Sequence, residues 1–376
     1  MDALMLPLNW QRVRLGDIAE INPPTIIPNV FYYIDLENVE KGQLLNKQLM
    51  TKNKAPSRAR RLLSKNDILY QLVRPYQRNN YFFTLNGNYV ASTGYAQIRT
   101  LQNPSFLYFA LHSNYFVNAV LDRCEGTSYP AISSNELKKC EVILPPLNEQ
   151  IAIADILSDL DRYLHALNSL ILKKESVKKA LSFELLSQRK RLKGFNQAWQ
   201  RVRLGDIAEI KRGVRITKNE LDVFGKYPVV SGGVGFLGYT NNFNRYENTI
   251  TIAQYGTAGY VNFQKNKFWA NDVCFCIYPN KDIIKNIFLY YFLKVNQNYL
   301  YEISNRNATP YSISKDKILD FEIPLPPLNE QIAIADILSD LDKEIANLKN
   351  KKRQFDNIKK ALNHDLMSTK IRVLKK

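Results

Sequence analysis

The stretch LPPLNEQIAIADILSDLD at Leu144–Asp161 recurs without a single change at Leu325–Asp342. A second stretch, WQRVRLGDIAEI, occurs at Trp10–Ile21 and again at Trp199–Ile210. The chain is therefore a tandem duplication, in which the short motif, a block of 122 or 114 residues and the long motif follow one another twice. A period this long indicates two large modules and excludes a solenoid of short repeats.

The long motif predicts a helix. Asn148 follows two prolines as the expected N-cap, and Glu149 stands in the first turn, where a negative charge favours the helix dipole. A helix from Asn148 to Arg189 would contain 42 residues and measure about 63 Å. Its apolar residues alternate at spacings of three and four, which is typical of a coiled-coil seam. The predicted seam residues are Ile153, Leu157, Leu160, Leu164, Leu167 and Ile171 in the first copy, and Ile334, Leu338, Leu341, Ile345, Leu348 and Phe355 in the second.

A helix with a single apolar seam must bury that seam, and its own duplicate is the nearest partner. Because a whole block lies between the two copies, we expect an antiparallel pair related by a pseudo-two-fold axis. Two unrelated amphipathic helices on separate domains are the alternative. In the paired arrangement the helices would fix the separation of the two blocks.

The two blocks between the motifs do not resemble each other, and both predict mixed α/β domains. Short runs of Tyr, Phe, Val and Ile broken by turn residues predict strands, for example Thr249–Ala253 and Val273–Tyr278, and helices are expected at Ser105–Val120 and Ile283–Val295. The predicted fold class is α+β, with two mixed domains separated by a long antiparallel two-helix coiled coil. The predicted boundaries are 1–143 for the first domain, 144–194 for the first long helix, 195–324 for the second domain and 325–376 for the second long helix.

The charge of the chain is basic throughout. The net charge is +17, divided as +5, +3, +5 and +4 over residues 1–143, 144–195, 196–324 and 325–376. An excess spread over the whole body favours a long polyanion such as DNA over a small acidic substrate, with a merely soluble basic protein as the alternative. The four cysteines form no CxxC pair, which predicts neither disulfides nor a zinc site. With no signal peptide and no apolar run of membrane-spanning length, we expect a cytoplasmic protein.

Basic, amide and aromatic residues interleave in both blocks. Arginine suits guanine edges, asparagine and glutamine suit adenine edges, and both lysine and arginine hold phosphates. A solvated surface is the alternative interpretation. The candidate DNA-binding residues are Arg58, Arg60, Arg61, Arg74, Tyr76, Arg78, Asn79 and Asn80 in the first block, and Arg212, Arg215, Lys218, Tyr239, Asn241, Asn242, Gln254, Tyr255, Arg306 and Asn307 in the second.

Motifs that could carry catalysis are weak. Asn22–Thr25 reads NPPT and is similar to the Asn-Pro-Pro-aromatic loop of adenine methyltransferases, but threonine replaces the aromatic residue. Gly233–Gly238 matches GxGxxG, but the sequence that follows is turn-like instead of helical. None of the three histidines has metal or triad spacing. We therefore expect no catalytic residue, no metal and no cofactor on this chain.

The ordered motifs resemble the specificity subunits of type I restriction–modification systems. The resemblance rests on PLPPLNEQIAIADIL at Pro324–Leu338 and its near-copy at Leu144–Leu157, on the doubled WQRVRLGDIAEI, and on KKALSFELLSQRKRL from Lys178. The first block resembles one type of target-recognition domain through YIDLENVEKG and APSRARRLLSKNDILYQLVRPYQRN. The second resembles another type through YPVVSGGVGFLGYT, FWANDVCFCIYP and NATPYSIS, although it has Gln254 where many such domains carry arginine.

The resemblance implies a function that is divided between chains. Each target-recognition domain would read one half of a split, asymmetric site in double-stranded DNA, while the helices set the spacing and dock two modification (methyltransferase) subunits. Restriction subunits would join that core. S-adenosylmethionine and ATP are then expected on the partner subunits, and none on this chain. A methyltransferase or nuclease acting alone, and a coiled-coil scaffold with no DNA role, are the competing hypotheses.

Overall fold

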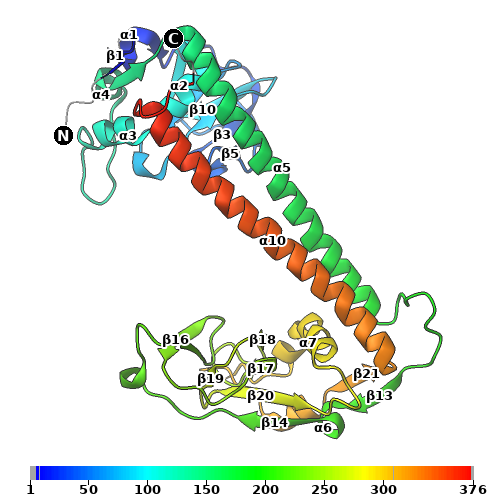
Figure 1. The fold of residues 1–376 in the computed structure, drawn as a ribbon. Coiled ribbons are helices and arrows are strands. Elements are labelled where there is room, and N and C mark those ends of the chain that lie inside the picture. The colour runs from blue at the N-terminus through cyan, green and yellow to red at the C-terminus, as the bar shows by residue number, and fades with distance from the viewer. Residues whose placement is uncertain (1–5, 8, 308, 374–376) are drawn as a thin grey trace. The chain divides into compact units, whose positions relative to one another are not determined.

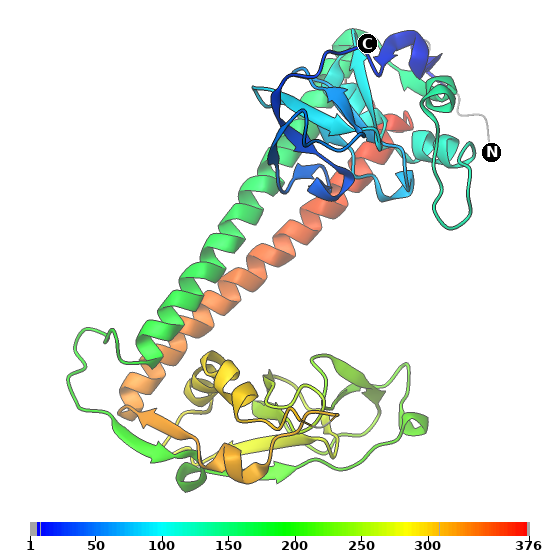
Figure 2. The same cartoon turned by 180° about the vertical axis from the view of Figure 1, so that it is seen from behind.

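The computed structural model describes residues 6–7, 9–307 and 309–373 of the chain. It divides into two compact units. Unit 1 comprises residues 1–168 and 350–376, and unit 2 comprises residues 169–349. Each unit therefore joins one variable block to half of each long helix, as the colours in Figures 1 and 2 show. The four-part division expected from the sequence stays a prediction, since the boundaries of the two units lie within the long helices instead of at their ends.

Unit 1 contains two four-stranded sheets and short helices. Its helices are α1 (Leu15–Ile18), α2 (Pro104–Ala110), α3 (Asn114–Leu121) and α4 (Ser134–Lys139), with 3₁₀ turns η1 (Leu36–Asn38) and η2 (Pro75–Gln77). Its strands are β1 (Gln11–Arg14), β2 (Ala19–Ile21), β3 (Val30–Ile34), β4 (Val39–Glu40), β5 (Gln43–Leu44), β6 (Gln48–Thr51), β7 (Ala59–Leu62), β8 (Ile68–Gln71), β9 (Tyr81–Phe82), β10 (Tyr89–Ser92), β11 (Tyr95–Thr100) and β12 (Glu141–Leu144). The larger sheets have the orders β6-β3-β10-β7 and β2-β11-β8-β9.

Unit 2 has different sheets. Its helices are α6 (Leu204–Ile207), α7 (Asn286–Val295), α8 (Gln297–Glu302) and α9 (Lys315–Leu319), with the 3₁₀ turn η3 (Lys218–Glu220). Its strands are β13 (Gln200–Arg203), β14 (Ala208–Arg212), β15 (Tyr227–Val230), β16 (Phe236–Thr240), β17 (Thr249–Ala253), β18 (Val261–Gln264), β19 (Trp269–Ala270), β20 (Cys274–Pro279) and β21 (Glu322–Leu325). The sheets have the orders β14-β20-β17-β18 and β16-β15-β19.

One feature is common to the two blocks: the short motif closes each block by pairing with the strand that leads into the long helix. In unit 1, β1 pairs antiparallel with β12, so that Gln11 lies opposite Leu144. In unit 2, β13 pairs with β21 in the same register, with Gln200 opposite Leu325. The repeated sequences therefore bring the two ends of each variable block together, whatever lies between them.

The predicted strands agree with the structure better than the predicted helices. Thr249–Ala253 is β17, and Val273–Tyr278 differs from β20 by one residue at each end. The prediction of one helix over Ser105–Val120 was wrong, because the segment divides into α2 and α3. The side chain of Ser113 accepts a hydrogen bond from the backbone N–H of Phe116 and so begins a new helix in the middle of the apolar run.

The long helices are α5 (Leu147–Leu186) and α10 (Leu328–Met367), each of 40 residues. The first begins at Leu147, before Asn148, so the prediction of Asn148 as the N-cap was wrong. The first also ends before the basic residues near Arg189. Gln188 and Thr369, at equivalent positions of the repeat, adopt left-handed φ values of 63° and 64°. A residue in this conformation commonly terminates a helix.

Within each unit the two long helices contact each other, and they run side by side in both views of the ribbon (Figures 1 and 2). In unit 2, Lys178 of α5 pairs with Asp342 of α10 at 2.5 Å. In unit 1, Lys359 of α10 pairs with Asp161 of α5. Lys178 and Lys359 occupy equivalent positions of the repeat, and so do Asp161 and Asp342. The lysine of each helix pairs with the aspartate of the other, which requires the helices to run antiparallel.

The predicted seam residues are mostly withdrawn from solvent. They also contribute to the core of each block, because Ile153 and Leu157 of α5 pack in the largest cluster of unit 1 together with Leu366 of α10. Leu338 of α10 and Leu185 of α5 do the same in unit 2. Ile153, Leu157, Leu164, Leu167, Ile171, Ile334, Leu338 and Ile345 are buried, whereas Leu160, Leu341, Leu348 and Phe355 are half-buried.

A buried carboxylate connects three segments of unit 2. Glu330, in the first turn of α10, has a side chain that is 1% exposed. It accepts a hydrogen bond of 2.9 Å from the indole N–H of Trp199, in the short motif. Arg191, which follows α5, donates to both carboxylate oxygens, with Nη2–Oε2 at 2.7 Å and Nε–Oε1 at 3.2 Å. A carboxylate this far from water is stable only when its charge is paired and hydrogen-bonded.

Unit 1 repeats this junction with the equivalent residues. Glu149, in the first turn of α5, accepts from the indole N–H of Trp10 at 2.9 Å and pairs with Arg372, which follows α10. The glutamine that comes next in the motif is used twice as well: Gln150 and Gln331 each donate to the carbonyl of the proline five residues before them, at 2.8 Å. We name these two groups the Trp–Glu–Arg junctions.

The junction of unit 2 predicts a large effect of Glu330→Ala on stability. The substitution leaves the Arg191 guanidinium and the Trp199 N–H without their acceptor, so the free energy of unfolding should fall by about 3 kcal/mol. The matched control is Glu322→Ala, which removes an exposed ion pair with Arg201 and should cost less than about 1 kcal/mol. Urea unfolding of both variants measures the difference. Equal losses in the two variants would contradict a structural role for the junction.

Candidate nucleic-acid interface

The loop over residues 74–80 of unit 1 contains five of the candidate residues. Arg74 and Arg78, at its two ends around η2, adopt left-handed φ values of 54°. Arg78 donates hydrogen bonds of 2.8 Å to the carbonyl of His112 and to Asn114 Oδ1, and burial lowers the pKa of Arg78. Asn80 is buried, and its Oδ1 accepts from the backbone N–H of Gln71. Arg78 and Asn80 therefore hold the loop in shape.

The other residues of this loop are more available. Tyr76 is exposed, and the guanidinium of Arg74 stacks over the ring of Tyr129 at 4.2 Å. Asn79 accepts from the exposed backbone N–H of Lys41. The loop thus presents a tyrosine and an arginine–tyrosine stack, which are side chains suited to phosphates and base faces.

A second group of candidates lies on and before β7. Arg58 pairs with Asp35 and donates to the hydroxyl of Tyr33 at 3.1 Å. The hydrogen bond to Tyr33 and the charge of Asp35 raise the pKa of Arg58. Arg60 is exposed, and its Nε donates to the carbonyl of Ser57. Arg61 is half-buried in the strand. Arg58 is therefore already paired within the domain, whereas Arg60 and Arg61 have no acidic partner among the described residues.

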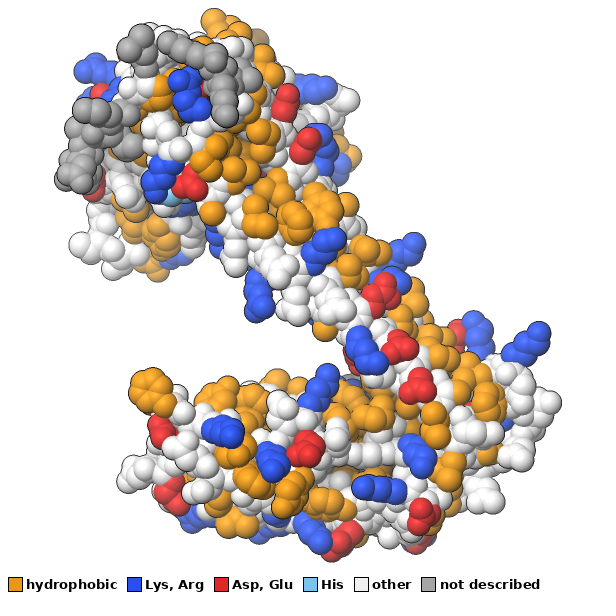
Figure 3. Space-filling view, in the orientation of Figure 1, with side chains coloured by type: hydrophobic (Ala, Val, Ile, Leu, Met, Phe, Trp, Pro, Cys, Tyr) orange, Lys and Arg blue, Asp and Glu red, His pale blue; other side chains and the backbone are white. Residues whose placement is uncertain are grey.

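In unit 2 the basic candidates follow β14. Arg212 donates to the carbonyl of Asp272 at 2.5 Å, and its own carbonyl accepts from Arg245. Arg215 and Lys218 are exposed, and their side chains make no hydrogen bond or ion pair with any residue that the structure describes. They are therefore free to contact a polyanion. On the face drawn in Figure 3, lysine and arginine side chains are dispersed instead of gathered in one patch.

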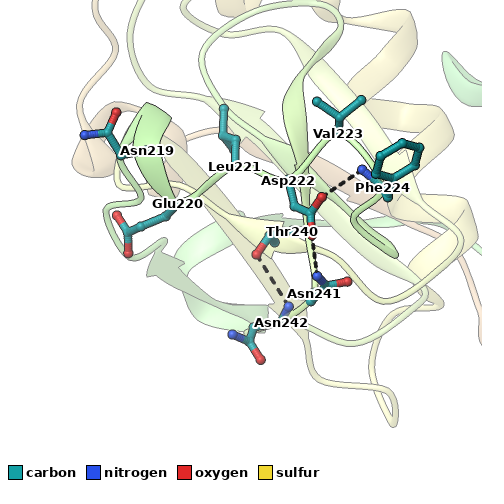
Figure 4. A pocket seen from close by; sticks show the side chains of 9 residues that line it. All are labelled: Asn219, Glu220, Leu221, Asp222, Val223, Phe224, Thr240, Asn241 and Asn242. Carbon is teal, nitrogen blue, oxygen red and sulfur yellow. Dashed lines mark hydrogen bonds between the residues drawn. The ribbon is translucent and has the colours of Figure 1, made fainter.

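The hollow beside β16 suits an anion poorly. Its volume is about 620 Å³, and it is lined by residues 219–224 and 240–242. Figure 4 shows that two carboxylates, Glu220 and Asp222, belong to this lining. Asp222 accepts from Asn241 Nδ2 at 2.6 Å and from the backbone N–H of Phe224. Asn241 is therefore held within the domain, while Tyr239 and Asn242 are exposed.

The remaining candidates of unit 2 lie near Gly256, which has a φ of 77°. The backbone of Gln254 donates to Val273 and accepts from Ile313, and its side-chain Oε1 is buried without a hydrogen-bond partner among the described residues. Tyr255 forms an isolated bridge with Ser312. The guanidinium of Arg306 lies over the rings of Tyr301 and Tyr311, at 5.4 and 5.3 Å. Asn307, the next residue, is exposed.

The motifs that could have carried catalysis are used by the fold. Asn22 of the NPPT stretch donates to Ser134 Oγ at 2.8 Å and accepts from the backbone N–H of Gln97. The GxGxxG stretch runs into β16 and not into a helix. Among the described residues, no group of three or more His, Cys, Asp or Glu side chains could hold a metal ion. In the same part of the chain, no helix is long and apolar enough to cross a membrane.

Two cations near the candidates were missed from the sequence. Lys52 lines a cavity together with Arg60 and Arg61. Lys267 lies over the rings of Phe243 and Tyr246, at 4.6 and 5.3 Å. Each is separated in sequence from the residues it accompanies, and no motif marks it. Lys52 follows β6, which belongs to the same sheet as β7 with Arg60 and Arg61.

The stability of unit 1 should depend on pH through His112, whose backbone carbonyl accepts a hydrogen bond from Arg78 of the loop over residues 74–80. Burial, aided by the charges of Lys359 and Arg78, lowers the pKa of His112 to about 4, below the usual value of about 6.5. Between these values the unfolded chain binds more protons, so stability falls as the pH falls. Urea unfolding measures the free energy of unfolding at pH 7 and at pH 5. The decrease from pH 7 to pH 5 should be about 2 kcal/mol smaller in His112→Gln than in the unchanged protein.

The matched control is His165→Gln, because His165 is exposed on α5. This variant removes an exposed imidazole and controls for the substitution itself. If His112→Gln lost as much stability as the unchanged protein between the two pH values, His112 would not be the source of the pH dependence.

Comparison with known proteins gives a consistent match. Residues 7–175 and 196–355 match the family described as type I restriction modification DNA specificity domain. The putative type I restriction enzyme MjaX specificity subunit of Methanocaldococcus jannaschii is 30% identical over 268 residues, which make up 65% of this chain and 62% of that protein. The match therefore spans less than two thirds of the MjaX subunit.

Two further matches extend over nearly the whole chain. The type I restriction enzyme MjaVIII specificity subunit of the same organism is 25% identical over 420 residues, which cover 99% of this chain and 95% of that protein. The crystal structure of a type I restriction–modification system S subunit from M. genitalium superposes with a TM-score of 0.70 at 20% identity. That alignment covers 96% of this chain and 98% of the other, and it establishes a shared fold.

Proposed function

The chain belongs to the family of type I restriction modification DNA specificity domains, and on this premise we propose that it is the non-catalytic specificity subunit of a type I restriction–modification complex. The observation that carries the proposal is the contrast between the two units. The segments that close each block and begin each long helix are repeated, and they make the same contacts twice. The sheets within the blocks differ.

Each block reads one half of a split site in double-stranded DNA. Different sheets and different exposed side chains present different donors and acceptors to the grooves, so the two half-sites differ and the whole site is asymmetric. In the first block the available candidates are Arg60, Arg74 and Tyr76, and in the second they are Arg215 and Lys218. The even distribution of the net charge of +17 supports contact with DNA by both blocks.

The long helices form the antiparallel coiled coil that sets the spacing of the half-sites. Two sets of contacts support this role. The reciprocal ion pairs Lys178–Asp342 and Lys359–Asp161 fix the register of the pair. The Trp–Glu–Arg junctions attach each block to the first turn of one helix and to the segment after the other. A block cannot then rotate freely about its own helix.

Two equivalent surfaces on the helices dock two modification subunits. Ile151 and Ile332 occupy the same position of the repeat, and they are 44% and 45% exposed. An isoleucine that is kept in both copies, and that faces solvent in both, contributes little to the core and is suited to an apolar contact with a partner. Identical surfaces bind identical partners, which gives one methyltransferase subunit for each copy.

The catalytic chemistry belongs to the partners. The modification subunits bind S-adenosylmethionine, and restriction subunits that use ATP join the complex in the cytoplasm. This chain recognises the DNA sequence and binds no cofactor.

Methylation mapping tests the two-domain assignment. After co-expression with its modification subunit, single-molecule sequencing should show methylation of a split, asymmetric sequence. Replacing residues 211–324 by the corresponding block of another specificity subunit should change one half of that sequence and leave the other half and the spacer as they were. A contiguous palindrome, or a change in both halves, would contradict the proposal. Methylation by the purified chain alone would show that it is an enzyme.

Docking is tested by charged substitutions on the exposed isoleucines. Ile151→Asp and Ile332→Asp should each remove one modification subunit, since burial of an unpaired carboxylate in an apolar contact is unfavourable. Native mass spectrometry counts the subunits in each complex. The matched control is Leu172→Asp on α5, because Leu172 is exposed but its repeat position is occupied by Arg353. A full complement of subunits in both isoleucine variants would rule out this surface.

A further inference from the structure

A cationic cavity lies in unit 1 beside β7. Its volume is about 460 Å³, and it is an open hollow lined by the loop after β2, by Phe31 of β3, by the segment after β6 and by β7 with the residues that lead into it. Three cationic residues, Lys52, Arg60 and Arg61, belong to its lining, and no aspartate or glutamate is found among the described residues that line it. A hollow with three positive charges and no carboxylate favours an anion.

Arg61 lacks a partner that the fold could supply. Its Nε is buried and makes no hydrogen bond with any described residue. Burial and the charge of Arg60 lower the pKa of Arg61, which is the direction expected when a cation is short of counter-charge. An anion in the cavity would provide both the missing acceptor and the missing charge. Arg60 is held ready beside it, because its Nε donates to the carbonyl of Ser57 at 2.8 Å.

The rest of the lining includes an apolar wall that is fixed in place. Pro23, Pro24 and Phe31 contribute to it. The loop that carries the two prolines leaves β2 through Asn22, which has a φ of 58°. The side chain of Asn22 bonds to Ser134 and to the backbone of Gln97, so the loop is anchored at its base. The cavity therefore combines two guanidinium groups with a rigid apolar face.

We propose that this cavity binds one phosphodiester of the DNA backbone, with the phosphate against Arg60, Arg61 and Lys52 and its deoxyribose against the proline wall. The proposal rests on the proposed function and deepens it. A contact of this kind carries no sequence information, and it fixes the register of the first block on the duplex. It also gives the NPPT stretch a role in shaping a sugar–phosphate site.

The salt dependence of DNA binding tests the site. The slope of log K against log salt concentration is negative, and loss of one phosphate contact reduces its magnitude by about 0.9. The assembled complex carrying Arg61→Gln should therefore bind a duplex with its mapped target more weakly, with a slope smaller in magnitude by about 0.9, and should methylate the same sequence. The matched control is Arg123→Gln, which removes an equal charge from a partly exposed pair with Glu136 outside the cavity and should leave the slope unchanged.

Two further measurements make the result decisive. Arg61→Lys retains the charge and should restore the slope, whereas a lysine variant as defective as the glutamine variant would show that charge is not what the site supplies. Thermal unfolding with inorganic phosphate as the probe distinguishes a free anion. Stabilisation by phosphate that Arg61→Gln abolishes, with no change in the DNA slope, would overturn the assignment to the DNA backbone.

Failure of the site and failure of the proposed function are separable. If the unchanged complex does not bind the duplex, the proposed function itself is wrong. If it binds and Arg61→Gln matches Arg123→Gln in slope, only the cavity assignment is wrong.

Discussion

A buried carboxylate in the first turn of each long helix is the constraint on which the rest of the structure depends. Burying the side chains of Glu149 and Glu330 is costly unless a guanidinium and an indole N–H reach them. Those groups come from the segment after the opposite helix and from the short motif before the block. Satisfying one charge therefore brings together three segments that are far apart in the chain, and the duplication repeats the requirement in the second unit.

This constraint explains why some sequence is repeated to the letter while the rest differs. The repeated residues contact one another: the tryptophan bonds to the glutamate, and the aspartate pairs with the lysine. In the same way β1 pairs with β12, and β13 pairs with β21. A change in one would need a matching change in its partner. The sheets inside the blocks differ, while the strand pairs that close the blocks are the same.

The candidate interface divides into residues that shape it and residues that remain available. Partners within the domains already bind the side chains of Arg78, Asn80 and Asn241. Substituting them would change the shape of the surface and would not remove a direct contact with a ligand. Arg61, Arg215 and Lys218 make no ion pair with a described residue. A dispersed set of unpaired cations is suited to a long polyanion, whose charges are also spread out, and this agrees with the proposed role in DNA recognition.

The sequence by itself determined the duplication, the two long helices, several strands such as Thr249–Ala253 and the membership of a DNA-specificity family, because these depend on local periodicity and on ordered motifs. The division of residues 105–120 into two helices was decided by one side chain, Ser113, whose capping bond no apolar pattern reveals. Only the tertiary structure showed which arginines are paired and which are free, and that Lys52 joins Arg60 and Arg61. Such groupings depend on which strands pair, and strand pairing depends on contacts between residues far apart in the chain.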